Sequence, residues 1–431
     1  MNKLIIVLIA ILATWEICAQ KNPDFVLHKS VQIGLTPGIG SNTIYDLKVE
    51  NNISINLISG QSYRNNYFCF SGASNFQIQY SYGINLAGIS NVVGGYPFLK
   101  GNQEKDSLAY MKAIQLAGLF NVVNGKGEGL QLTGGINSVI RSFDGVQISG
   151  FYNHIGNAFS GVQLSLLANN FHSIGIGVQT GLLLNRGNRL SGGQFLGMLN
   201  IIIDELDGMQ VGFFNYIGNR NGEIYRERVF YWTQIGLLNK AIKNGDGFQL
   251  GVINLGRDIG FSQIGVVNFS NKIPQYPIGP INLSKDMEGY VRYYYNRIFP
   301  YNFEIGTGSR KVMNSLGYSL DGNRRIWGLS YSLGNQIKGG TNNSQYFIEY
   351  NIHSQVIFEK NNQLKDPQHL FGLRLQVGFN PFIDTKIPWM YFFIGATGKV
   401  GNINDEILGE NLVGRISNNR GWLDLNFGVQ L

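Results

Sequence analysis

The chain has 431 residues, and its 34 Lys and Arg exceed its 27 Asp and Glu to give a formal net charge of +7. The basic residues are scattered instead of forming a stripe, so no nucleic-acid partner is expected. Charged residues make up 14% of the chain, against about 25% in ordinary soluble domains, while aromatic residues reach 13% and glycine 57 positions, a composition that indicates β-structure in a membrane or a β-repeat.

The first residues predict a secretory signal peptide at residues 1–19. A short basic start is followed by an apolar run at residues 4–13 and by the small residue Ala19. The run is far shorter than the roughly 20 residues that a membrane-spanning helix needs. The mature chain, residues 20–431, is therefore expected to leave the cytoplasm, with Cys69 as its one cysteine and no intramolecular disulfide.

Long segments of strict alternation predict β-strands with one apolar and one polar face. Residues 75–86 and residues 422–431 are the clearest examples, since every second residue is apolar. Strands that cross a membrane need about 9 to 11 residues, against about 5 to 6 in soluble proteins. Aromatic residues near the ends of such strands, among them Trp327 and Trp389, are typical of the girdle at a membrane interface.

A repeat of 14–16 residues occupies most of residues 111–269. Each unit carries a Gln, and in the first six units an Asn follows six residues later, which places both on one strand face. Turn-forming pairs such as Asp144-Gly145 separate the units. The Gln positions are Gln115, Gln131, Gln147, Gln163, Gln179, Gln194, Gln210, Gln234, Gln249 and Gln263.

Two architectures explain this repeat. In a parallel β-solenoid each unit is one coil and the Gln side chains stack into a ladder. In a closed barrel each unit is one antiparallel wall strand, and the non-repeat residues 288–431 supply the rest of the wall, because no sheet edge can stay open in lipid. We therefore expect an all-β chain forming a single antiparallel transmembrane β-barrel of roughly 18–22 strands, about half of it built from the repeat, with a β-solenoid as the alternative.

The unit Gly-Val-Gln-(Ile/Leu)-x-Gly-x-x-Asn, represented by residues 208–215 and 247–254, resembles the bacterial surface-repeat family of predicted outer-membrane proteins. The resemblance covers about residues 111–269. It implies a surface location and brings no established biochemical activity. A barrel in the cell outer membrane would have the outer-membrane lipid and the barrel-assembly machinery as its partners.

No residue pattern predicts catalysis, a cofactor or a metal site. His353-Ser354 is an adjacent His and Ser pair, and neighbours in a strand point to opposite faces, so they cannot form a catalytic dyad. No grouping of Asp, Glu and His has the spacing of metal ligands, and the Gly-rich stretches lie in hairpins instead of between a strand and a helix. We expect a non-enzymatic protein without cofactors.

The alternation also predicts which residues line a barrel lumen. In the non-repeat wall they are Arg292, Glu304, Glu349, Arg374 and Asp424, and in the repeat they include Gln147 and Asn153. Val146 would then face lipid, so Val146→Arg is expected to harm assembly more than Gln147→Arg.

Two functions are compatible with this lumen. The first is a passive pore or transporter for small solutes, in which the lumen charges act on the solute; equally, these charges would form ion pairs that brace the wall. The alternative is a surface-exposed structural or adhesion scaffold whose loops bind a partner. The sequence does not indicate the solute or the surface ligand.

Overall fold

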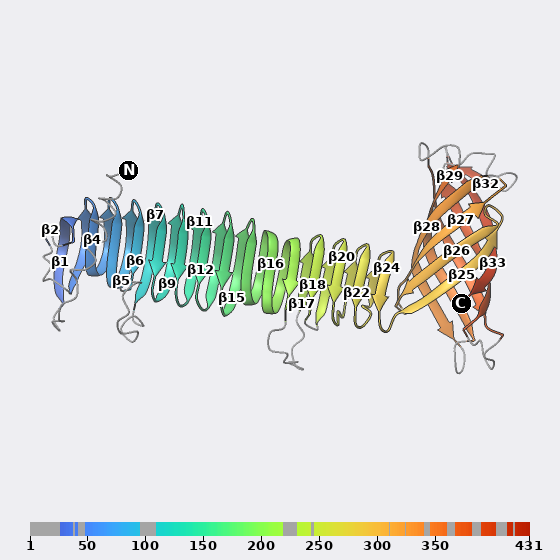
Figure 1. The fold of residues 1–431 in the computed structure, drawn as a ribbon, viewed down its shortest axis with the longest axis horizontal. Helices are drawn as coiled ribbons and strands as arrows, with labels where there is room; N and C mark the ends of the chain where they lie inside the picture. Colours follow the sequence, from blue (N-terminus) through green and yellow to red (C-terminus); the bar gives the residue numbers. More distant parts are fainter. Residues whose placement is uncertain are drawn as a thin grey trace. The chain divides into compact units, whose positions relative to one another are not determined.

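The computed structural model contains two compact units, residues 1–226 and residues 227–431 (Figure 1). The expected signal peptide lies outside the described residues, so its prediction stays open. Within the described part of the chain the regular elements are all β-strands, which confirms the all-β class. The described residues are 26–37, 39–41, 48–94, 109–218, 231–242, 245–309, 311–323, 325–339, 345–359, 367–381, 389–401, 412–416 and 419–431.

Across those described stretches, no helix is both long and apolar enough to cross a membrane.

The first unit is a stack of parallel strands, apart from the short β2, which pairs antiparallel with β1. Its strands are β1 (Leu27–Thr36), β2 (Ile39–Gly40), β3 (Val49–Asn56), β4 (Ser59–Ser71), β5 (Ser74–Ala87), β6 (Ser90–Val93), β7 (Tyr110–Ala117), β8 (Phe120–Val123), β9 (Lys126–Thr133), β10 (Ile136–Val139), β11 (Phe143–Ser149), β12 (Tyr152–Ile155), β13 (Phe159–Ser165), β14 (Ala168–Phe171), β15 (Ile174–Gly181) and β16 (Leu184–Ile217).

Each repeat unit of this stack is one coil of a solenoid. A long strand such as β11 runs one way, a short strand such as β12 returns, and the next coil repeats the pair. Gln147 of β11 lies beside Gln131 of β9 on one side and Gln163 of β13 on the other, in parallel register. Asn153 of β12 is aligned in the same way with Asn137 and Asn169.

The placement of the repeat as antiparallel wall strands of one large barrel is therefore corrected, and the β-solenoid alternative describes it. A parallel stack in register brings each Gln against the equivalent Gln of the next coil, which antiparallel pairing of successive units would not do. The coils also extend beyond the repeat: residues 75–86, interpreted above as a barrel strand, lie in β5, which pairs in parallel with β4 and β7.

A glycine of positive φ recurs in successive coils from Gly129 to Gly208, which explains why the motif begins with Gly there. Gly145 has a φ of 140°, in a region that favours glycine. Gly145 takes the inward position between Phe143 and Gln147, while Asp144 and Val146 lie on the outside, as in the ordinary alternation of a strand. A Cβ at this position would lie 2.0 Å from the carbonyl oxygen of Gly129 in the preceding coil, so no larger residue fits without a shift of the backbone.

The second unit contains further coils followed by a barrel. The coils pair in parallel, with Gln249 aligned between Gln234 and Gln263. Their strands are β17 (Tyr231–Ile235), β18 (Leu238–Ala241), β19 (Asp246–Leu250), β20 (Ile253–Gly256), β21 (Ser262–Ile264), β22 (Val267–Ser270), β23 (Tyr276–Ile278) and β24 (Ile281–Ser284).

The barrel is an antiparallel sheet closed by pairing of β25 with β33. Eight strands form the ring, and β32 adds a short hairpin on β33. The strands are β25 (Glu288–Asn296), β26 (Tyr301–Gly308), β27 (Met313–Asp321), β28 (Ile326–Gly339), β29 (Tyr346–Glu359), β30 (Gln368–Phe379), β31 (Tyr391–Gly401), β32 (Leu412–Ile416) and β33 (Asn419–Gln430). The expected antiparallel barrel is thus present in the non-repeat residues, with fewer strands than the 18–22 expected, because the repeat does not contribute to the ring.

Candidate functional site

Four charged side chains lie together inside the barrel. Arg292 on β25 bonds Glu304 at 3.2 Å and Glu349 at 2.7 Å. Arg374 on β30 bonds the same two carboxylates, at 2.6 Å to Glu304 and 3.4 Å to Glu349. Each of the four is at most 2% exposed. The cluster is electrically balanced, with two guanidinium groups against two carboxylates, and it ties together four strands of the wall.

Amide and aromatic side chains complete this cluster. The Oε1 atom of Gln376 accepts a hydrogen bond from Arg292 at 2.6 Å, and Gln336 donates one to Glu349 at 3.0 Å. The guanidinium of Arg292 also lies over the ring of Tyr290, 4.3 Å from its centroid, a favourable cation–π geometry. The amide partners could not be predicted from the sequence, because Gln336 meets Glu349 through strand register and Gln376 meets Arg292 through closure of the ring.

Asp424, the fifth expected lumen residue of this wall, lies in a second buried group. Its carboxylate is 3.4 Å from the ammonium of Lys399, which also donates to Gln355 at 2.9 Å. Lys399 and Asp424 are 3% and 2% exposed. Here too an interior charge is paired with the opposite charge.

Apolar clusters lie inside the barrel at both ends of this polar interior. One consists of Ile298, Phe299, Ile326, Ile357 and Leu370, around the β25–β26 turn and the neighbouring strand ends; the other consists of Tyr294, Phe347, Tyr391 and Phe393. The interior of an eight-stranded barrel is only just wide enough for side chains. The described part of the interior is accordingly filled by packed apolar side chains and paired charged side chains.

A Ser and His pair inside the barrel was not predicted. The hydroxyl of Ser332 and Nδ1 of His353 are 2.9 Å apart, because β28 and β29 place these residues opposite each other. Sequence reasoning compared His353 with its neighbour in the chain, whereas the partner lies on the next strand. Ser332 and His353 are 2% and 3% exposed, so a substrate in solvent cannot reach the hydroxyl, and the pair acts as a buried hydrogen bond.

The outer face of the barrel is apolar. On β30, Leu373, Leu375 and Val377 are 70%, 55% and 47% exposed, while the alternating Arg374 and Gln376 point inward and are buried. The same alternation occurs around the ring, where the exposed residues include Val291, Tyr293, Phe303, Ile305, Leu316, Tyr318, Leu329, Ile348, Tyr350, Ile352, Phe392, Ile394, Leu423, Leu425 and Phe427. A barrel with a polar inside and an apolar outside is the reverse of a soluble barrel.

Gln147 and Asn153, the two repeat residues expected in a lumen, lie instead in the interior of solenoid coils. Gln147 donates to Gln131 at 2.8 Å and accepts from Gln163 at 2.8 Å. Asn153 accepts from Asn137 at 2.9 Å and donates to Asn169 at 2.9 Å. Both side chains point into the interior of a coil stack and not into a barrel lumen, because the strands pair in parallel.

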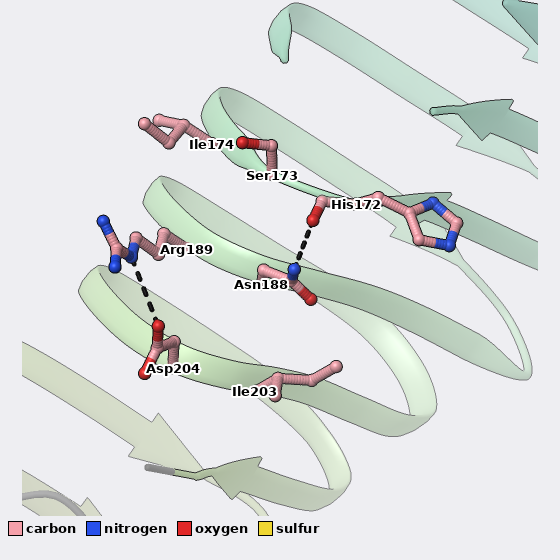
Figure 2. Close-up of a pocket in the computed structure, with 7 residues that line it drawn as sticks. All are labelled: His172, Ser173, Ile174, Asn188, Arg189, Ile203 and Asp204. Carbon is pink, nitrogen blue, oxygen red and sulfur yellow. Dashed lines mark hydrogen bonds and ion pairs between the residues drawn. The ribbon is translucent and has the colours of Figure 1, made fainter. Parts of the chain in front are cut away.

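A polar groove on the first unit is lined by successive coils (Figure 2). Its volume is about 500 Å³. Nε of Arg189 lies 3.3 Å from the carboxylate of Asp204, and the Asn188 side chain donates to the carbonyl of His172. The ion pair neutralises the charge that this groove would otherwise present to an anion. Among the described residues, no group of three or more His, Cys, Asp or Glu is arranged to hold a metal ion.

No protein-family model matches the chain, and no curated protein or solved structure matches it significantly.

The solenoid interior reverses the mutational expectation drawn from the sequence. Gln147→Arg puts an unpaired charge at a fully buried site and removes one partner from each neighbouring Gln, which should cost several kcal/mol. Val146→Arg lies on the outer face and should cost less than about 1 kcal/mol. Hydrogen exchange of the backbone amides in the coils measures the free energy of local opening in each of the two variants. A larger loss for the Val146 variant would contradict the assignment of faces.

The buried ion-pair cluster makes a second prediction. Arg374→Met leaves the carboxylate of Glu304 with one cationic partner fewer and should lower the free energy of barrel unfolding by about 3–5 kcal/mol. The control is Lys338→Met, which removes a partly exposed pair with Glu288 at 3.0 Å and should cost less than about 1 kcal/mol. Urea unfolding in detergent, followed by tryptophan fluorescence, compares the two. Equal losses would show that the interior cluster does not brace the barrel.

Proposed function

We propose that this protein is a non-enzymatic outer-membrane protein in which the eight-stranded barrel anchors a β-solenoid scaffold at the cell surface. The observation that carries the proposal is the alternation of the barrel wall, apolar outward and charged inward, as on β30 with Leu373 and Leu375 outside and Arg374 inside. Apolar surface of this extent in water is unfavourable, whereas lipid accepts it without cost.

Strand length supports a membrane location. β29, β30 and β31 contain 14, 12 and 11 residues, and a strand that crosses a bilayer needs about 9 to 11. Closure of the ring by β25 and β33 leaves no open sheet edge between them, as lipid requires. The resemblance to the surface-repeat family and the expected signal peptide agree with this location.

The filled interior favours a scaffold over a passive pore. A pore needs interior charges that face a water-filled passage, whereas Arg292, Glu304, Glu349 and Arg374 are bonded to one another and buried. These paired charges fit the second role considered for the lumen residues, in which ion pairs brace the barrel wall. The amide side chains inside the coils are likewise buried and bonded to one another, so the coils offer only their outer surface. A surface ligand would therefore be bound on the outside of the solenoid or on the loops.

The proposal is tested by placing a charge on the outer wall. Leu375→Arg should reduce the amount of folded barrel in the outer membrane, because an Arg at the bilayer midplane costs about 2–4 kcal/mol. The matched control is Ile140→Arg on the solenoid: Ile140 is 53% exposed and Leu375 is 55% exposed. Membrane fractionation with a folded-state assay measures both. Equal assembly of the two variants, or recovery of the wild type as a soluble monomer without detergent, would contradict a membrane anchor.

A further inference from the structure

The coils of the second unit have one apolar edge. The turns that follow β17, β19 and β21 each carry an exposed aliphatic side chain, with Leu237, Val252 and Val266 exposed by 49%, 46% and 50%. These residues are stacked, since the amide of Val252 bonds the carbonyl of Leu237 and that of Val266 bonds Val252, both at 3.0 Å. Leu250, Ile253 and Ile281 extend the edge and are at least 36% exposed.

The opposite edge of the same coils carries charged residues, together with the aromatic pair Phe261 and Tyr276, of which Phe261 is 50% exposed. Arg257 and Lys272 are stacked there, the amide of Lys272 facing the carbonyl of Arg257 at 3.4 Å, and both side chains are exposed. Asp258 occupies the neighbouring position and pairs in parallel with Lys272. The turns with Val252 and Val266 therefore carry no charged residue, whereas the turns at the opposite edge carry Arg257, Asp258 and Lys272.

The first unit, considered by itself, repeats this pattern. Leu167, Leu183 and Leu199 are stacked through bonds of 3.0 and 2.9 Å and are at least 38% exposed. At the other end of the coils the equivalent stack contains Ser173 and Arg189 (Figure 2). An apolar edge thus occurs in these coils of the first unit as well, whereas the coil that turns at Gly134 and Gly135 has no aliphatic side chain there.

Hydrogen bonds within the second unit fix the position of the last coil along the strands of the barrel wall. Gln275, on the charged side of that coil, accepts from Ser309 at 2.8 Å and from Lys311 at 2.9 Å, both in the β26–β27 turn at the barrel rim. Further along the coil, Pro277 and Gly279 bond the side chain of Asn314, inside β27, at 2.6 and 3.0 Å. The charged edge therefore lies level with the rim, and the apolar edge lies beside the wall.

We propose that the apolar edge of coils 231–284 is immersed in the lipid bilayer beside the barrel, with phospholipid acyl chains as its partner. This inference rests on the proposed membrane anchor. Beyond Asn314 the outward residue of β27 is Leu316, which is 41% exposed, so the apolar edge continues the apolar face of the wall. At the other edge Arg257 and Lys272 lie at rim height, where basic side chains meet anionic headgroups.

A soluble protein partner fits this edge less well than lipid does. An edge beside the lipid-facing wall would be accessible only to a partner that itself enters the bilayer. Lipid needs no specific shape to cover a row of small aliphatic side chains such as Leu237, Val252 and Val266, since apolar burial is non-directional. A second copy of the chain remains an outcome that the experiment distinguishes.

The experiment measures lipid contact at three positions of the full chain in liposomes. An environment-sensitive fluorophore is attached to Val252→Cys on the apolar edge, to Lys272→Cys on the charged edge, or to Ile394→Cys on the barrel wall, which is 65% exposed. Cys18 is replaced by serine, and Cys69 does not compete for the label near neutral pH because burial raises its pKa to about 12. Phospholipids carrying a spin label on the acyl chain serve as quencher.

We expect quenching of several-fold at Val252 and Ile394 and little at Lys272. Quenching at Ile394 without quenching at Val252 would overturn this inference and leave the membrane anchor in place. Absence of quenching at Ile394 would overturn the anchor as well. A fluorophore at Val252 that is shielded from water but not quenched by lipid would mean that a protein surface, such as a second copy, covers the edge, and it would also overturn the inference.

Discussion

The structure depends on the requirement that polar side chains removed from water find hydrogen-bond partners. The solenoid interior contains amides instead of a purely apolar core, and each amide has both a donor and an acceptor. Gln147 uses both, one toward Gln131 and one toward Gln163. Such a ladder works only when every coil supplies the same residue in the same register, which is the physical reason for a sequence that repeats.

The barrel meets the same requirement without a repeat. Its interior pairs opposite charges from distant strands, with Arg292 and Arg374 shared between Glu304 and Glu349. Such a cluster is costly to break, since loss of one member leaves a buried charge uncompensated. A polar interior of this kind leaves the apolar residues of each strand for the outside. The same two-residue alternation thus produces an outer surface suited to lipid and an interior held by ion pairs.

Part of this architecture could be predicted from the sequence. Alternation on β30 correctly assigned Arg374 inward, and the all-β class follows from the length of such segments. The pairing direction of the repeat could not be predicted from its period. A barrel strand with its turn and a solenoid coil of two short strands have the same period in the sequence. The contact of Gln131 with Gln147 decides between them, and this contact is non-local. The pair Ser332 and His353 was missed for the same reason, since its partners meet only through register.

The central claim is that paired side chains fill the barrel interior, so that any function lies on the outer surfaces. Planar-bilayer recording on the purified, folded chain tests this claim most directly. We expect no unitary conductance for the wild type, because paired charges and apolar clusters fill the ring. Stable conductance steps whose preference between anions and cations changes when Glu349 is neutralised by Glu349→Gln would contradict it, since those charges would then face a water-filled passage.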